Sequence, residues 1–311
     1  MANATPSRLG QADGAGSDTA LYLKVFAGEI LTAFRETNVF MPRTLVRTIS
    51  HGSSAQFPAT WKASASYHTP GVELVGQVIN HNERIITIDD LLIADAFVAK
   101  IDEAMNHYDI RSEYAFQLGA ALAKQFDTNM AQVLYLTARA SATVSGGNGG
   151  TAITDADAAT SGDSLVASIY EAAQALDEKD VPSFDRFAYL APEQYYQVVL
   201  SDKVIQKEFI ANPSGVGIDT GRVRAVAGFE LVATNNLPTA LVNTGPAAYQ
   251  GDFSTSVALC AQRTAAGTVK LLDLAVETAW DPRRRGTLML AEYALGHGIL
   301  RPEAAVEIKS A

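Results

Sequence analysis

The polar side chains most able to do chemistry lie in one short stretch of the chain, at Asp102, Glu103, His107, Asp109, Arg111 and Glu113. On a helix, Glu103 and His107 are four residues apart and share a face, as do Asp109 and Glu113. A carboxylate beside an imidazole could act as a general base or bind a metal, which would make the chain a soluble hydrolase that uses the carboxylates near His107. The simpler interpretation is an ion-paired helix face, exposed to solvent or lying between subunits. We favour it because charged residues with helical spacing form such pairs on many helices.

Other patterns of known chemistry are missing from the sequence. The glycine-rich run at 146–150 leads into Thr151, not into the Lys and Ser or Thr that a phosphate-binding loop requires. No Gly-x-Ser-x-Gly nucleophile motif occurs, and the five histidines lack the spacing of a zinc site. The single cysteine, Cys260, lies in an apolar run and is predicted to be buried and unreactive. We therefore expect no enzyme activity, no cofactor and no metal.

A second polar candidate is the run Arg283, Arg284 and Arg285, which follows Pro282. Guanidinium groups bind phosphates and carboxylates in bidentate geometry, so the run could hold phosphate or the acidic side chains of a partner. A turn of solvated arginines is the alternative. We retain the three residues as candidate contacts between subunits.

The element that positions the first polar stretch is predicted to be a long helix. Between residues 91 and 145 there is no proline and only one glycine, Gly119, and apolar residues recur with helical period. A continuous helix of about 33 residues would be roughly 50 Å long at 1.5 Å per residue. Exposing the apolar side of such a helix to water is energetically unfavourable, so we expect a sheet to pack along it.

Residues 46–89 are predicted to form short β-strands separated by glycine and proline, with the clearest alternation at residues 84–88. The middle of this segment, residues 59–82, has few large apolar side chains. A two-stranded ribbon so sparse is marginally stable in water. We therefore expect an adjacent molecule to support it, with Trp61, Lys62 and Tyr67 as candidate contacts.

The N-terminal part of the chain allows two interpretations. Residues 1–17 are rich in Gly, Ala, Ser and Pro and are predicted to be disordered. After them, Leu23, Phe26, Ile30 and Phe34 follow helical spacing. Such a helix could belong to the core, or it could form an arm that lies under neighbouring subunits. Its position alone does not decide between the two.

The remainder of the chain is predicted to alternate helices and strands. Residues 146–162 are expected to form a flexible loop, and Asp163 to cap a helix at 164–178. The elements expected after it are a strand at 187–190, a helix that begins at Pro192 and a strand at 229–233.

Length and charge limit the classes of function. At 311 residues the chain can bury a stabilising core without disulfides. Its net charge of −10, from 24 basic and 34 acidic residues, opposes tight nonspecific binding to nucleic acid. The sequence has neither a secretory signal nor an apolar run of about 18 residues. We therefore expect that the protein does not associate with membranes and that it stays in the cytoplasm of the cell that makes it.

Four separated blocks of sequence carry a family resemblance. They are IDEAMNHYDIRSEYAFQLG at 101–119, LYLKVFAGEILTAF at 21–34, SAQFP at 54–58 and GHGILRPEAA at 296–305. In their order along the chain they resemble segments of the major capsid proteins of short-tailed phages of the T-seven group, the T-seven-like podoviruses or autographiviruses. Residues 189–195 and 228–238 are similar, more weakly, to phrases common in capsid proteins of the Hong Kong 97 fold. The resemblance covers nearly the whole chain except residues 141–165.

The resemblance implies an α+β fold of the Hong Kong 97 type, with an N-terminal arm, an E-loop hairpin, a long spine helix, and peripheral and axial domains. The implied limits are an arm at 1–50, an E-loop at 51–89, a peripheral domain with the spine helix at 90–145, an axial domain at 146–285, and C-terminal strands of the peripheral domain at 286–311.

The implied function is mechanical. Copies of the chain would form hexamers and pentamers that close an icosahedral shell around double-stranded DNA, which is enclosed without sequence specificity in the virion. A scaffolding protein would template the shell, and a portal protein would replace one pentamer. No covalent crosslink is expected, because nothing identifies an acceptor for Lys62, the only lysine of the E-loop. An encapsulin-like compartment that loads protein cargo is the alternative within the same fold.

Overall fold

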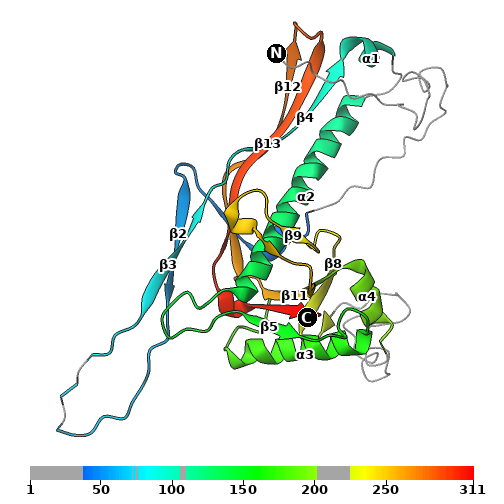
Figure 1. The fold of residues 1–311 in the computed structure, drawn as a ribbon. Coiled ribbons are helices and arrows are strands. Elements are labelled where there is room, and N and C mark those ends of the chain that lie inside the picture. The colour runs from blue at the N-terminus through cyan, green and yellow to red at the C-terminus, as the bar shows by residue number, and fades with distance from the viewer. Residues whose placement is uncertain (1–37, 72, 75, 106–109, 202–224) are drawn as a thin grey trace. The chain divides into compact units, whose positions relative to one another are not determined.

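The computed structural model describes residues 38–71, 73–74, 76–105, 110–201 and 225–311 (Figure 1). The predicted arm residues Leu23, Phe26, Ile30 and Phe34 lie outside the described residues, as do His107 and Asp109. The chain divides into two compact units. The first comprises residues 1–38, 89–126 and 271–295, and the second comprises residues 39–88, 127–270 and 296–311.

The helices and strands follow a mixed order along the chain. The longer elements are β2 (Ser54–Thr60), β3 (His81–Thr87), β4 (Leu92–Ala99), α1 (Lys100–Met105), α2 (Ile110–Arg139), α3 (Gly162–Glu178), β6 (Arg186–Leu190), α4 (Pro192–Val199), β8 (Phe229–Ala233), β11 (Ser256–Gln262), β12 (Ala266–Asp281), β13 (Gly286–Ile299) and β14 (Ala305–Lys309). The shorter ones are η1 (Met41–Arg43), β1 (Leu45–Thr48), β5 (Thr151–Thr154), β7 (Ala225–Val226), β9 (Leu241–Val242), η3 (Ala247–Tyr249), β10 (Gly251–Asp252) and η4 (Pro302–Ala304). The small β9–β10 pair is antiparallel.

In the first unit, strand β4 pairs antiparallel with β13, from Leu92 opposite Tyr293 to Ala99 opposite Gly286. The four-stranded sheet that contains them has the order β1-β12-β13-β4. The hydroxyl of Tyr293 donates a hydrogen bond of 3.3 Å to the carbonyl of Leu122 on α2, so strand and helix are joined within this unit. Residues 92–99 form a strand, although they lie in the segment 91–145 that was predicted to be helical. The lack of Pro and Gly in that segment is compatible with either structure.

The predicted long helix is present as α2, which has 30 residues against the expected 33 or so. In the second unit its side chains are buried around the circumference, including Met130, Ala131, Val133, Leu134 and Tyr135. A helix that is apolar on several sides must be covered on several sides. This part of α2 therefore forms the centre of the second unit.

The second unit contains a six-stranded sheet of order β5-β14-β11-β6-β8-β7. Strand β11 pairs antiparallel with β14 on one side and β6 on the other. Cys260, at its middle, is fully buried, as predicted, and burial raises the pKa of its thiol to about 12. Strand β14 therefore lies in this sheet, whereas the family resemblance implies that residues 286–311 belong to the peripheral domain. Periodicity reveals a strand but not its partner.

Two helices pack on the six-stranded sheet. Helix α3 contacts β14, β5 and β7, and α4 contacts β6 and β8 (Figure 1). Pro192 begins α4, as predicted. The predicted cap of α3 is wrong by two residues: the Ser161 hydroxyl accepts a hydrogen bond from the N–H of Ser164, and Asp163 lies in the first helical turn. An acidic residue is favoured at either place because both lie near the helix N-terminus.

The glycine-rich run between α2 and β5 is closely packed, so the prediction of a flexible loop over 146–162 is wrong. Residues 151–154 form strand β5, and the ammonium of Lys179 donates a hydrogen bond of 2.7 Å to the carbonyl of Gly149. A Cβ at Gly150 would lie 2.2 Å from the carbonyl oxygen of Ala138. Glycine is needed here because the backbone passes against the end of α2, and composition does not separate that need from flexibility.

The chain enters the second unit at a buried carboxylate. Asp127, which is fully buried on α2, accepts hydrogen bonds from the N–H groups of Val39 and Phe40 at 2.9 and 3.2 Å. The amide of Asn236 donates to the same carboxylate at 3.2 Å. The Phe40 ring stacks on Tyr189 of β6, with ring centroids 4.4 Å apart. These contacts join η1, α2 and the sheet.

The base of the β2–β3 hairpin sits on an apolar cluster formed by Ala55, Ile86, Val269 and Leu300. We call this cluster the pivot. Strand β13 passes directly against it, because a Cβ at Gly296 would lie 1.9 Å from the Thr87 carbonyl oxygen. A Cβ at Gly298 would similarly lie 2.7 Å from the Ile86 side chain. The two glycines therefore allow the close approach that seals the base of the hairpin.

His297, between these glycines, faces a buried polar site. Its Nδ1 lies 2.9 Å from the Thr268 hydroxyl, and its N–H donates a hydrogen bond of 3.2 Å to the Tyr249 hydroxyl. Burial lowers the pKa of the imidazole to about 3. The side chain is therefore neutral at neutral pH, because burial disfavours the charged imidazolium.

The end of α2 is tied to β14 by a buried ion pair. The guanidinium of Arg139 donates two hydrogen bonds to the carboxylate of Glu307, at 2.7 and 2.5 Å. Glu307 has no exposed side-chain surface, whereas Arg139 retains 24%. The hydrogen bond to Glu307 raises the pKa of Arg139. Ser256 of β11 also donates to Glu307, at 2.5 Å, so one carboxylate connects a helix and two strands.

We predict that Glu307→Gln lowers the free energy of unfolding by about 3 kcal/mol, because it leaves the partly buried charge of Arg139 without its partner. Urea titration of the unassembled chain measures the change. The matched control is Glu171→Gln on the exposed face of α3, which should change the value by less than about 0.5 kcal/mol. Equal effects at the two positions would contradict the structural role given to the pair.

We predict opposite signs for two Gly→Ala substitutions. Gly296→Ala should lower the free energy of unfolding by about 1–3 kcal/mol, because the new methyl group meets the Thr87 carbonyl. Gly119→Ala on α2 has no atom within 4 Å and should raise it by up to about 1 kcal/mol through helix propensity. The same titration tests both, and a stabilising Gly296→Ala would show that β13 does not seal the hairpin base.

Candidate assembly surface

The hairpin continues beyond its paired strands as a long ribbon (Figure 1). Strands β2 and β3 pair antiparallel from Ser54 opposite Thr87 to Thr60 opposite His81. Beyond them one backbone hydrogen bond, from Trp61 N to Asn80 O at 3.0 Å, continues the ladder. Further out, the Gln77 side chain takes the place of a backbone pair. Its amide nitrogen donates to the Ser64 carbonyl at 2.6 Å, and its amide oxygen accepts from the Ser64 N–H at 3.0 Å.

The described residues from 62 to 83 are all exposed. Their large apolar side chains include Tyr67, which is fully exposed, and Leu74 and Val78, which are 80% and 89% exposed. Isolated exposed apolar residues are ordinary, but several on one thin ribbon form a surface that water solvates poorly. We call residues 61–80 the ribbon. The described part of the chain leaves Tyr67, Leu74 and Val78 on it largely exposed.

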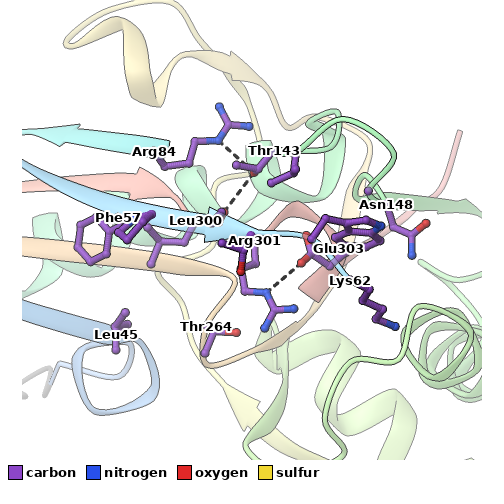
Figure 2. A pocket seen from close by; sticks show the side chains of 16 residues that line it. Leu45, Phe57, Lys62, Arg84, Thr143, Asn148, Thr264, Leu300, Arg301 and Glu303 are labelled. Atoms are coloured by element: carbon purple, nitrogen blue, oxygen red, sulfur yellow. Dashed lines mark hydrogen bonds and ion pairs between the residues drawn. The ribbon is translucent and has the colours of Figure 1, made fainter. Parts of the chain in front are cut away.

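A hollow of about 400 Å³ lies beside the inner end of the ribbon (Figure 2). Its lining includes Phe57 and Trp61 from the hairpin, Thr143 and Asn148 from the segment after α2, and Arg301 from the C-terminal segment. Arg301 pairs with Glu303 at 2.9 Å, a contact drawn in Figure 2. All of these residues belong to the second unit.

One face of the hairpin is fastened to the segment after α2 by polar side chains. The Asn80 amide donates to the Ser145 carbonyl at 2.9 Å, and the Asn82 amide donates to the Thr143 carbonyl at 2.7 Å. The Arg84 Nε donates to the Thr143 hydroxyl at 3.1 Å (Figure 2). These residues were not among the candidates predicted from the sequence. A pattern in the sequence could have identified them: Asn80, Asn82 and Arg84 are polar and occupy every second position of an extended segment, so their side chains lie on one face.

The three candidate contacts at the hairpin lie in different settings. Tyr67 points into solvent, and Lys62 is exposed and pairs with the carboxylate of Asp180. Trp61 is half-buried: a Cβ at Gly147 would lie 3.3 Å from its ring. Tyr67 is therefore open to a partner. Lys62 is exposed but already pairs with Asp180, and Trp61 mainly packs on its own chain.

The arginine run forms the turn between β12 and β13. The Asp281 carboxylate accepts hydrogen bonds from the N–H groups of Arg283 and Arg284, at 2.8 and 3.3 Å, and Arg285 adopts a left-handed backbone with φ of 55°. All three arginines are exposed. The turn therefore has a defined backbone that presents three guanidinium groups to its surroundings.

The polar stretch around His107 is only partly described. Asp102 is buried in the first unit, at 4% exposure, which does not fit a solvated ion-pair face at that position. Within the described residues, no group of three or more His, Cys, Asp or Glu side chains is arranged to hold a metal ion. No described helix combines the length and apolar character needed to cross a bilayer.

Comparison with known proteins connects this architecture to one family. A family model described as Gp10A-like major capsid protein matches residues 56–309. The major capsid protein of Escherichia phage T7 is 36% identical over 322 aligned residues, which cover 94% of this chain and 92% of the relative. The major capsid protein of Enterobacteria phage T3 is 35% identical, with 95% and 93% covered.

Solved structures agree with these relatives. The capsid structure of cyanophage P-SCSP1u matches with a TM-score of 0.83 at 38% identity and covers 99% of both chains. The mature capsid of bacteriophage PhiM1 matches with a TM-score of 0.76 at 19% identity, covers 99% of this chain and 98% of its own, and shows the fold alone. The predicted α+β fold of the Hong Kong 97 type is confirmed. These matches support neither the compartment nor the hydrolase alternative. The chain belongs to the Gp10A-like family of major capsid proteins, the non-enzymatic proteins that associate with their own copies to form the shells of phage virions.

Proposed function

We propose that copies of this chain form hexamers and pentamers that close an icosahedral shell around double-stranded DNA. The observation that carries the proposal is the ribbon, whose apolar side chains Tyr67, Leu74 and Val78 are left exposed by the described residues of their own chain. Burying one such side chain contributes about 1.5–3 kcal/mol. A neighbouring copy can supply that burial.

The ribbon favours a ring of subunits. It differs from the surface that would receive it, so each contact joins two unlike patches. Such head-to-tail contacts form closed rings when the rotation between copies closes. Pentamers and hexamers are rings of this kind, and the predicted E-loop at 51–89 is the part of the chain that would reach over the neighbour.

The N-terminal arm would add a second contact between copies. Its apolar residues Leu23, Phe26, Ile30 and Phe34 follow helical spacing and would lie under neighbouring subunits. The proposed arm at 1–50, peripheral domain at 90–145 with strands from 286–311, and axial domain at 146–285 complete the subunit.

The partners beyond the chain itself would be a scaffolding protein, a portal protein and DNA. A scaffolding protein would set the curvature of the shell, and a portal would give DNA an entrance through a wall that is otherwise closed. The net charge of −10 opposes binding of phosphate over most of the surface, so the DNA would be held by confinement. The shell would be non-covalent, since Lys62 pairs with Asp180 of its own chain.

We predict that the double substitution Leu74→Asp and Val78→Asp abolishes shells while the chain stays folded, because both side chains are exposed in the free chain and buried only on assembly. Negative-stain microscopy after co-production with a scaffolding protein tests assembly, and urea titration tests folding. Ser66→Asp adds charge to a polar, exposed position of the same ribbon and should leave shells intact. Normal shells from the double variant would exclude the ribbon as a main contact.

We predict that the arginine turn contacts carboxylates of a neighbouring copy, because the chain has 34 acidic residues against 24 basic ones. Replacing Arg283, Arg284 and Arg285 with Gln should weaken assembly and reduce its sensitivity to salt, as light scattering against NaCl concentration would show. Arg263→Gln, an exposed single change elsewhere, should matter less than Arg283→Gln. Salt-dependent DNA binding that is lost in the triple variant, with assembly unchanged, would assign the turn to phosphate instead.

A further inference from the structure

The hollow beside the hairpin has the size and the lining of a binding pocket. Its volume of about 400 Å³ lies within the range of roughly 300–1,000 Å³ that is typical of ligand sites. Strand alternation places Phe57, Ala59 and Trp61 on one face of the hairpin, and these residues form one wall. Leu45 and Leu300 add to the apolar lining (Figure 2). The hollow can therefore receive an apolar side chain.

The charged residues of the hollow are mostly basic. Of the lining residues, three carry a positive charge and one, Glu303, carries a negative charge. The three are Lys62, Arg84 and Arg301, which come from the hairpin and from the C-terminal segment. This local excess of positive charge stands in a chain whose net charge is −10. A concave site with charges of one sign attracts ligands of the opposite sign, so the hollow favours an anion.

Arg84 differs from the other two cations of the hollow. Lys62 and Arg301 are already paired with carboxylates of the chain. Arg84 is half-buried, and its Nε donates a hydrogen bond to the Thr143 hydroxyl at 3.1 Å. Its guanidinium forms no ion pair with a carboxylate of the described residues. Because the terminal nitrogens of a guanidinium bind carboxylates in bidentate geometry, Arg84 can hold a carboxylate that enters the hollow.

An apolar wall beside an unpaired guanidinium suits one class of ligand best. A peptide segment with a large apolar side chain next to Asp or Glu satisfies both features. A nucleic acid suits them less well, because a polyanion would extend beyond the hollow over a chain that is acidic overall. The ribbon of a second copy is also a poor match, since its charged residues are Lys62 and Glu73, whose charges cancel.

We propose that the hollow is a docking site for a short acidic segment of another protein. One large apolar side chain of the segment packs against Phe57 and Leu300, and a neighbouring carboxylate binds Arg84. The apolar contact supplies affinity, and the carboxylate selects acidic segments over neutral or basic ones. The site lies within the second unit of a single chain, so it does not depend on the proposed shell.

A selection from random peptides tests the proposal without a known partner. Nine-residue peptides displayed on yeast are sorted for binding to the unassembled full chain that carries Trp280→Phe, which leaves Trp61 as the single tryptophan. The enriched peptides should combine Leu, Ile, Phe or Trp with Asp or Glu. Each synthetic peptide should shift Trp61 emission to the blue, because Trp61 lines the hollow. Changing the acidic residues of a peptide to amides should weaken its binding about tenfold.

Three variants of the chain separate charge from shape. Arg84→Gln should weaken binding of the selected peptides about tenfold, because it removes the charge that holds the carboxylate. Ala59→Leu fills the hollow without changing its charge, and it should abolish binding while the urea midpoint does not fall. Arg263→Gln is the matched control, since Arg263 is exposed and lies outside the lining, and its affinity should equal that of the parent.

Several outcomes would overturn the proposal. The first is a selection that enriches no acidic peptide, and the second is a set of peptides that bind Arg84→Gln and Ala59→Leu as tightly as the parent. Dimers of the chain that disappear with Ala59→Leu in sedimentation velocity would show that a second copy occupies the hollow instead. Binding of a twelve-nucleotide DNA that Arg84→Gln weakens, with no peptide enriched, would assign the hollow to nucleic acid.

Discussion

A two-stranded ribbon has no second layer, and that constraint governs the rest of this structure. Each side chain on such a ribbon faces water unless another element covers it, and no part of the described chain covers residues 62–71. Tyr67 is consequently as exposed as in an unfolded peptide. In a compact enzyme domain, such a segment would be shorter or would pack back onto the domain. In a family of shell-forming proteins, an uncovered surface of this kind is available for contact between copies.

In the block at residues 296–305, neighbouring residues of the chain are each constrained by a different packing or hydrogen-bond contact. Gly296 and Gly298 let β13 approach the hairpin base, and His297 between them turns to Thr268 and Tyr249 on the other side. Leu300 then fills the pivot. Each position is restricted by a different neighbour, so substitution at any one of them disturbs a separate contact. That is a physical reason for the block's similarity to the family.

Much of this fold could be predicted from local sequence patterns. Apolar residues with the period of a helix or strand, and Pro or Gly at the ends, predict α2, β3, β6, α4 and β8. The partners of these elements could not. Nothing in the sequence near β14 shows that it pairs with β11 and β5, and the charge of Glu307 argues against burial until Arg139 is known to lie beside it. Asn80, Asn82 and Arg84 were missed for a related reason. Asn80 and Asn82 read as loop residues, and only the position of residues 143–145 gives their amides a function.

Stability in this chain is unevenly distributed, and assembly needs that distribution. The body of the second unit is held by apolar packing around α2 and by the Arg139–Glu307 pair, contacts that resist local opening. The hairpin is held by a small pivot and by hydrogen bonds that water can replace. A subunit with a rigid body and an easily moved contact element can form a weak contact, lose it and form it again until its neighbours are correctly placed. Many weak contacts then act together in a closed shell, where the loss of one leaves the others in place to restore it.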